Sequence, residues 1–138
     1  MQELIGVMTG AAIGGVVRYW LSGVIGKYCG EDIPWGTIAV NISGAFMIGL
    51  IGAFLLSLPA GTAFYGLSLW HFYVIGFMGS YTTVSSFSLQ TLTLLYNGET
   101  RNAAINIILT ILPGLAAVSA GYLAGDILLT DLAGVVPS

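Results

Sequence analysis

The sequence predicts an all-α integral membrane protein of four transmembrane helices, of which the third is broken. Of the 138 residues, 57% are hydrophobic and only 7% are charged, whereas soluble domains carry about 25% charged residues. The charges are also unevenly spaced, because none lies between Asp32 and Glu99 or between Arg101 and Asp126. A transmembrane helix needs roughly 20 apolar residues, so both intervals are long enough to cross a bilayer.

A single four-helix membrane domain is expected over residues 1–138. The apolar runs show no alternation of apolar and polar residues, which disfavours a β-barrel. Turn-forming residues separate the runs in segments 27–34, 59–62 and 97–99. The four spans are therefore expected at about 4–26, 35–57, 67–96 and 102–129.

The third span is longer than one bilayer crossing requires. Its middle, GFMGSYTTVSSFS at residues 76–88, is rich in Gly, Ser and Thr. Hydroxyl side chains compete for backbone hydrogen bonds and glycine lacks a Cβ, so this stretch can interrupt a helix. A break frees backbone carbonyls that can hold a cation. The residue types alone are equally compatible with a continuous helix whose hydroxyls bond to carbonyls one turn earlier.

The first span carries a face of small residues that ends in a cation. Gly6, Gly10, Gly14 and Arg18 recur every four residues and therefore share one side of a helix. Glycines allow another helix to approach closely, so Arg18 is expected on a packed face. A buried Arg costs about 2.5 kcal/mol or more, and no carboxylate lies at matching depth. Its partner is then a carbonyl, water or a mobile anion, unless the side chain extends to the headgroups near Lys27.

Polar residues form similar stripes on the other three spans. Individually they can be hydrogen-bonding contacts between helices, worth about 0.6 kcal/mol each. Together they predict a polar pathway for a small solute. The stripes contain Thr37 and Asn41 in the second span, Ser85, Ser88 and Gln90 in the third, and Asn102, Asn106 and Thr110 in the fourth.

The residues that are missing narrow the function further. The spans contain no Asp, Glu or Lys away from their ends, and His71 is the only imidazole, near the start of the third span. Ion-coupled pumps and antiporters need a titratable relay inside the membrane, so passive permeation is favoured. Neither a nucleophile–base pair, a metal-ligand cluster nor a phosphate-binding loop is present, which disfavours an enzyme. Nucleic acid is not an expected partner, because there is no basic patch.

Three segments carry a family resemblance. They are GAAIGGVVRYWL at residues 10–21, WGTIAVNISGAFMIG at 35–49 and GFMGSYTTVSSFSLQT at 76–91. In this order and spacing they resemble the Fluc/CrcB family of small fluoride channels, across nearly the whole chain. The resemblance implies a passive, fluoride-selective channel of the cell membrane, built as an antiparallel, dual-topology dimer. It also implies a structural Na⁺ at the break of the third helix, on the dimer axis.

The resemblance implies roles for individual residues. The Na⁺ ligands would be the backbone carbonyls of Gly79 and Thr82, one pair from each subunit. The pathway residues would match the family's pore Asn, its two phenylalanines, its hydroxyl track and its vestibule Arg. These positions are Asn41, Val84, Phe87, Ser85, Ser88, Thr91, Thr110 and Arg18, with Thr37 on the same stripe as Asn41.

The sequence departs from the family pattern at three positions. Val84 stands in place of the first pore Phe, Gln90 in place of the usual Glu, and Asn106 where some members have an aromatic residue. The valine removes one ring edge and the glutamine removes a proton-sensitive acid. These changes predict a pathway that is weaker or closed.

Charge placement leaves the partner open between a second copy and a paralogue. Lys27 and Arg101 follow the first and third spans, whereas the opposite side has no Lys or Arg. The positive-inside rule then favours one orientation, with both termini outside. An antiparallel homodimer needs both orientations from one chain, so the alternative is a heterodimer in which this chain is a pore-degenerate or structural subunit. A small dual-topology multidrug exporter is a second alternative, but it would need a membrane-embedded Glu in the first span.

Overall fold

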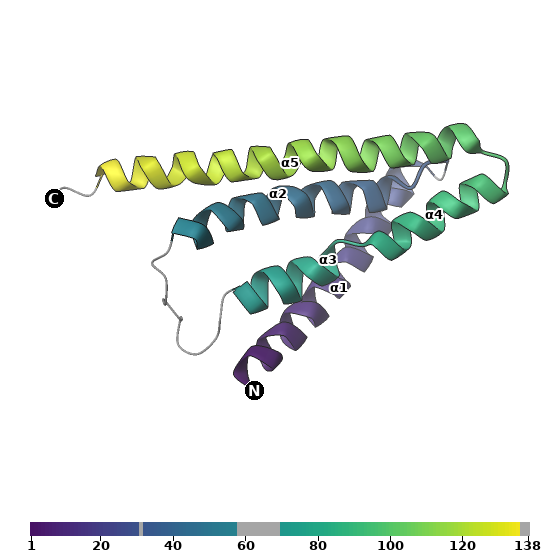
Figure 1. Ribbon diagram of the computed structural model, residues 1–138. Helices are drawn as coiled ribbons and strands as arrows, with labels where there is room; N and C mark the ends of the chain where they lie inside the picture. The colour runs from purple at the N-terminus through teal and green to yellow at the C-terminus, as the bar shows by residue number, and fades with distance from the viewer. Residues whose placement is uncertain (31, 58–69, 136–138) are drawn as a thin grey trace.

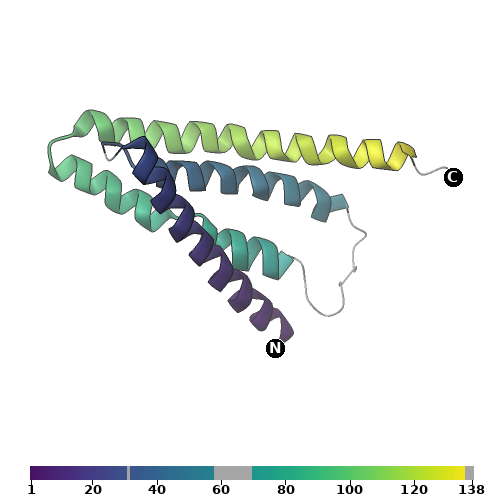
Figure 2. The same ribbon diagram turned by 180° about the vertical axis from the view of Figure 1, so that it is seen from behind.

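The computed structural model describes residues 1–30, 32–57 and 70–135, and over these residues all of the regular structure is helical. Figure 1 shows the helices α2 and α5 side by side and antiparallel. Below them in this view, α1 crosses the line of α3 and α4. The view from behind in Figure 2 shows the same arrangement. The elements are α1 (Gln2–Cys29), α2 (Trp35–Ser57), the π-helix η1 (Trp70–Met78), α3 (Gly79–Tyr81), α4 (Val84–Tyr96) and α5 (Thr100–Val135).

Three helices are long and apolar enough to cross a membrane: Glu3–Cys29, Trp35–Ser57 and Thr100–Asp131, within the described residues. The first and last helices run beyond the predicted 4–26 and 102–129. The third predicted span is divided among η1, α3 and α4, each too short to cross alone. Its predicted start near residue 67 and the predicted turn at 59–62 lie outside the described residues.

The predicted break in the third helix is confirmed, and a continuous helix is excluded. Thr82 and Thr83 have extended backbone angles, with ψ of 155° at Thr82 and φ of −148° at Thr83. Thr83 is the N-cap of α4, since its hydroxyl accepts a hydrogen bond from the Ser86 N–H at 3.1 Å. On the other side of the break, the Thr82 hydroxyl donates to the Met78 carbonyl at 3.0 Å. The two threonines thus end one helix and start the next.

The glycine face of α1 packs directly against the backbone of η1. A Cβ on Gly10 would collide with the backbones of Phe72 and Phe77, and one on Gly14 would collide with Phe77 and the Ser80 hydroxyl. The absence of these Cβ atoms therefore lets the two backbones touch. The sequence did not predict that η1 is a π-helix, a rare and wider form in which each N–H bonds five residues back.

Helices α2 and α5 use the same device. A Cβ on Gly49 would meet the backbone of Val118, and one on Gly121 would meet the backbone of Phe46. Close contacts between helix backbones therefore account for much of the packing, and few side chains form a buried core. Among the described residues, the buried hydrophobic side chains are Ile38, Val40, Ala53, Met78, Tyr81 and Ala103. Most large apolar side chains instead face outward, as expected for a surface in contact with lipid.

Candidate functional site

The break in the third helix is held by one side chain of α2. The side-chain amide of Asn41 hydrogen-bonds both the N–H and the carbonyl of Thr83, which lies 42 residues further along the chain. Asn41 Nδ2 donates to the Thr83 carbonyl at 3.0 Å, and the Thr83 N–H donates to Asn41 Oδ1 at 2.8 Å. An amide carries a donor and an acceptor side by side, so it can imitate the neighbouring strand of a sheet. Asn41 therefore stabilises the extended backbone at the break.

This arrangement takes away the hydrogen-bond donors of two particular carbonyls. In a continuous helix the Thr83 N–H would bond the Gly79 carbonyl, and the Ser86 N–H would bond the Thr82 carbonyl. In the structure the first N–H donates to Asn41 Oδ1 and the second to Thr83 Oγ1. The carbonyls that lose these donors belong to Gly79 and Thr82, the two positions for which a cation-binding role was predicted.

The chemistry of this break fits a hard monovalent cation. Backbone carbonyl oxygens are suitable ligands for such an ion, and they are left over where a membrane helix is interrupted. Gly79 is exposed, and a Cβ built on it would meet only the Val74 carbonyl, at 3.7 Å. Open space beside Gly79 leaves room for ligands from a second chain. Among the described residues, no cluster of three His, Cys, Asp or Glu side chains could hold a metal ion.

Arg18 lies against the start of α4. Its Nη1 donates to the Ser86 hydroxyl at 3.4 Å, and its buried Nε has no hydrogen-bond partner among the described residues. It also forms no salt bridge there, since the two groups within salt-bridge distance in the described part of the chain are the side chains of Glu3 and His71, at 3.9 Å. The N-terminus of a helix carries partial positive charge. A guanidinium without a carboxylate, placed beside that terminus, makes the region attractive to an anion.

Apart from Asn41 and Arg18, the predicted pathway residues fall into an inner and an outer group. The inner group lies between helices: Thr37 is 5% exposed, Thr91 is 8% exposed, and Phe87 and Thr110 are partly buried. The Thr110 hydroxyl oxygen is buried and has no hydrogen-bond partner among the described residues. These residues bring hydroxyls and one aromatic ring to buried or partly buried positions of α2, α4 and α5.

The outer group lies on the exposed face of α4. Val84 is 77% exposed, and both Ser85 and Ser88 are exposed. One chain therefore does not enclose these three residues.

A large pocket opens where α1 ends and α2 begins. It measures about 1010 Å³ and is lined by residues that include Lys27, Asp32, Glu99, Gln90 and Thr37. Gln90 Oε1 is buried without a hydrogen-bond partner among the described residues. Charged and amide side chains therefore contribute to the lining of this pocket, together with apolar residues such as Trp20 and Trp35.

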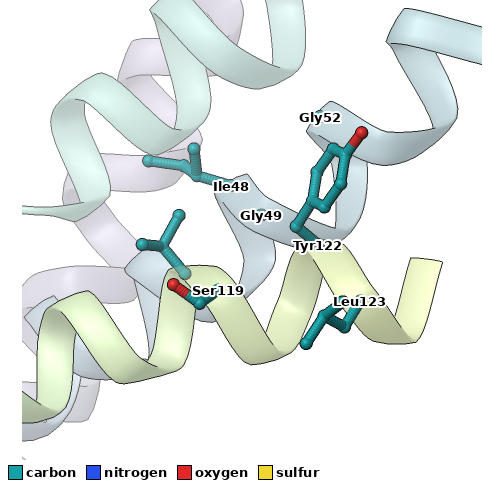
Figure 3. A pocket seen from close by; sticks show the side chains of 7 residues that line it. Ile48, Gly49, Gly52, Ser119, Tyr122 and Leu123 are labelled. Atoms are coloured by element: carbon teal, nitrogen blue, oxygen red, sulfur yellow. The ribbon is translucent and has the colours of Figure 1, made fainter. Parts of the chain in front are cut away.

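A second hollow, of about 510 Å³, lies between α2 and α5 and has a different character. Figure 3 shows its lining, which is mainly carbon: Ile48, Gly49, Gly52, Val118, Ser119, Tyr122 and Leu123. The Ser119 hydroxyl is already used, because it donates to the Leu115 carbonyl at 3.0 Å. None of the predicted pathway residues lines this hollow, so it is not part of the candidate site.

Three residues of the site were missing from the predicted pathway set. Thr83 and Ser86 belong to the TTVSSFS segment, but nothing in their spacing indicates that they meet Asn41 and Arg18. Asn106 is on the predicted polar stripe, and the structure buries it completely, at 0% exposure. Its Nδ2 donates to the Thr91 hydroxyl at 2.9 Å. Asn106 could have been found from its place on the polar stripe of the fourth span. For Thr83 and Ser86, the only indication in the sequence is that they lie close to the predicted break.

The chain is similar to one protein family and to several named ion channels over most of its length. The family model described as CrcB-like protein, Camphor Resistance (CrcB), matches residues 5–122. The chain is 47% identical over 126 residues to the fluoride-specific ion channel FluC 2 of Bradyrhizobium diazoefficiens, covering 91% of this chain and 90% of that protein. It is 46% identical over 119 residues to FluC 3 of Brucella suis, covering 84% and 86%. It is 42% identical over 125 residues to FluC of Rhodospirillum rubrum, covering 91% and 95%.

Proposed function

Since the chain belongs to the CrcB family of multi-pass membrane proteins, we propose that it is a fluoride-selective passive channel that exports fluoride across the cell membrane. The observation that carries this proposal is the 47% identity, over nine-tenths of both chains, to a protein named as a fluoride-specific ion channel. The relatives are ion channels, and this chain is likewise not an enzyme. The family model's match, residues 5–122, contains every residue of the candidate site.

The chemistry of the site supports an anion as the permeating species. Arg18 and the N-terminus of α4 attract negative charge, and Arg18 forms no ion pair with a carboxylate of the described residues. Hydroxyls and the second Nδ2 hydrogen of Asn41 can donate to fluoride in place of lost water. The positive edge of the Phe87 ring offers a weaker attraction. Several weak sites suit conduction, because an ion must be able to leave each one.

The driving force requires no coupled ion. A cell interior that is negative by 100 mV expels a monovalent anion with about 2.3 kcal/mol. Away from their ends, α1, α2, α4 and α5 contain no Asp, Glu or Lys other than Asp126 and Asp131 in the last turns of α5. A proton-relay mechanism is therefore unsupported, and a passive channel is the simpler assignment.

The functional unit that we propose is an antiparallel dimer with a structural Na⁺ at its centre. One chain offers the carbonyls of Gly79 and Thr82, and a second subunit would double this number. Na⁺, when bound, would neutralise the carbonyl dipoles and join the two broken helices. The exposure of Val84, Ser85 and Ser88 supports the same arrangement, since a second subunit would cover them.

A specific observation keeps the heterodimer as a second candidate. Val84, at the position of the first pore phenylalanine, is 77% exposed on the face that a partner would complete. In a homodimer both pathways would lack that ring. In a heterodimer with an oppositely inserted paralogue, the partner could supply it, and this chain would be the pore-degenerate or structural subunit.

The test is fluoride efflux from liposomes that contain this chain alone. A fluoride-selective electrode follows release after a K⁺ ionophore allows charge compensation, and a chloride electrode provides the control. Rapid fluoride release without chloride release is the expected result. Inserted, folded protein that releases no fluoride would overturn the homomeric channel; in that case co-expression with a paralogue would separate the heterodimer from a non-conducting protein.

A further inference from the structure

The geometry at the break points to a second role for Asn41: we infer that it is a positioning residue for the cation site, because it holds the Thr83 N–H away from the Gly79 carbonyl. The inference rests on the proposed Na⁺ site and assigns the residue that creates it. Asn41 was predicted to line the pathway, but both polar atoms of its amide bond the backbone of Thr83.

Two acceptors compete for one donor. The Thr83 N–H can bond either the Gly79 carbonyl, which would extend the helix, or Asn41 Oδ1, which breaks it. The structure selects the second bond, at 2.8 Å, and the reverse bond from Asn41 Nδ2 holds the Thr83 carbonyl as well. If the acceptor on residue 41 is removed, the Thr83 N–H has the Gly79 carbonyl as its remaining local partner. The carbonyl is then occupied by a hydrogen and turned along the helix, so it is lost as a cation ligand.

This role differs from ordinary contact between helices. Ser43, two residues further along α2, bonds the Tyr81 hydroxyl at 2.8 Å and also joins α2 to the broken helix. That bond is between side chains and leaves the backbone of the break untouched. Asn41 and Ser43 can therefore be compared directly. The contact of Asn41 leaves the Gly79 carbonyl without its helical donor, whereas the contact of Ser43 only joins α2 to the broken helix.

The same amide also connects the cation site to the pathway. Asn41 Nδ2 has two hydrogens, of which one is given to the Thr83 carbonyl. The second remains for a permeating anion. The two functions can be separated by chemistry, because the cation site depends on the acceptor of residue 41, whereas the anion depends on its donor.

Three variants of the full-length chain exploit this separation. Asn41→Leu has nearly the same shape and no polar atoms. Asn41→Asp keeps an acceptor for the Thr83 N–H. Ser43→Ala removes the neighbouring bond to Tyr81 and is the matched control. Should Asn41→Leu not be recovered as folded protein, Asn41→Ala supplies the same loss of the acceptor.

The measurement is thermal unfolding of purified protein in detergent, followed by tryptophan fluorescence, while Na⁺ replaces N-methylglucamine at constant ionic strength. A ligand that binds the folded state raises the unfolding temperature by an amount that grows with the logarithm of the ratio of its concentration to its dissociation constant. We expect Na⁺ to stabilise the wild type, Asn41→Asp and Ser43→Ala. We expect Asn41→Leu to need at least roughly tenfold more Na⁺ for the same shift, equivalent to about 1.4 kcal/mol. A uniformly lower unfolding temperature with unchanged Na⁺ dependence is the signature of lost packing alone.

The possible outcomes distinguish the role of Asn41 from the existence of the Na⁺ site itself. Unchanged Na⁺ dependence in Asn41→Leu, or its loss in Asn41→Asp, would overturn the role of Asn41 and leave the cation site intact. A wild type that Na⁺ does not stabilise would overturn the cation site itself, and this inference with it. Fluoride efflux from the wild type is measured separately and reports on the channel function in either case.

Discussion

Asn106 and Thr91 form a buried amide–hydroxyl pair in which the direction of each hydrogen bond is determined. Thr91 Oγ1 donates its proton to the Phe87 carbonyl at 2.7 Å, so it can only accept from Asn106 Nδ2, at 2.9 Å. The orientation of the amide follows, and it leaves Asn106 Oδ1 buried without a hydrogen-bond partner among the described residues. An unpaired buried acceptor costs about 1–3 kcal/mol, and at 0% exposure the described residues supply no hydrogen bond that offsets this cost.

The first prediction concerns this orphan acceptor. Asn106→Leu, of similar shape, is expected to leave the unfolding temperature unchanged or raise it, because it removes an unsatisfied polar group. Fluoride efflux is expected to fall by roughly tenfold, the effect of about 1.4 kcal/mol, because the interior loses an amide beside Thr91. Ser119→Ala, on the same helix, removes an exposed hydroxyl that bonds only the Leu115 carbonyl and is expected to alter neither quantity. A less stable protein with unchanged efflux would contradict the prediction.

The second prediction tests the charge of Arg18. Arg18→Gln is expected to reduce fluoride efflux at low ionic strength by roughly tenfold, the lower end of electrostatic steering effects. The reduction should diminish as an impermeant salt screens the site. Arg18→Lys keeps the charge and should retain most of the rate. Arg101→Gln, which removes a charge at the start of α5, is the control; an equal loss in this variant would show that overall charge, not the place beside α4, is responsible.

A third prediction compares two adjacent glycines of α1. Gly14→Ala is expected to destabilise the protein by about 1–3 kcal/mol, because its Cβ would collide with the Phe77 carbonyl and the Ser80 hydroxyl. A Cβ on Gly15 meets nothing within 4 Å, so Gly15→Ala should be neutral or more stable by up to about 1 kcal/mol. Thermal unfolding in detergent measures both. Equal effects of the two substitutions would contradict the close contact between α1 and η1.

The fourth prediction restores an aromatic ring at position 84. Val84 is 77% exposed, so Val84→Phe should fold without strain in a single chain. If the pathway is weak for want of a ring edge, this substitution should raise fluoride efflux severalfold, with chloride efflux still absent. Leu92→Phe adds a ring at another exposed position of α4 (51% exposed) and should change nothing. Efflux that does not rise in Val84→Phe, measured against this control, would mean that the valine is not limiting.

Much of the fold could be predicted from local features of the sequence. The charge-free intervals predicted the membrane helices, because they depend on residue type alone. The Gly, Ser and Thr content of residues 76–88 indicated where the third helix could break, but residue types left a continuous helix equally open, and the structure decides for the break. The four-residue spacing of Gly10 and Gly14 likewise predicted close helix packing, which the structure confirms against η1. Each of these features belongs to a single segment of the sequence and does not depend on how the helices are arranged.

The remaining features depend on how the helices turn toward one another. The sequence does not indicate that Asn41 meets Thr83, 42 residues away, because this contact is set by the rotation of α2 relative to the break. The π-helical winding of η1 was also missed, since no residue type specifies it and its backbone contact with α1 is tertiary. For Asn106, the stripe predicted a polar position but not complete burial, which arises only when α5 packs.

The double hydrogen bond between Asn41 and Thr83 also bears on regulation. A gate needs an element with two arrangements of similar free energy. Straightening the helix between α3 and α4 would leave both polar atoms of the Asn41 amide unpaired, at about 1–3 kcal/mol for each group. The double hydrogen bond therefore disfavours a switch at this joint. If the chain is the passive channel proposed above, it would act without a gate at this position, and the cell would adjust its fluoride tolerance through the number of copies in the membrane.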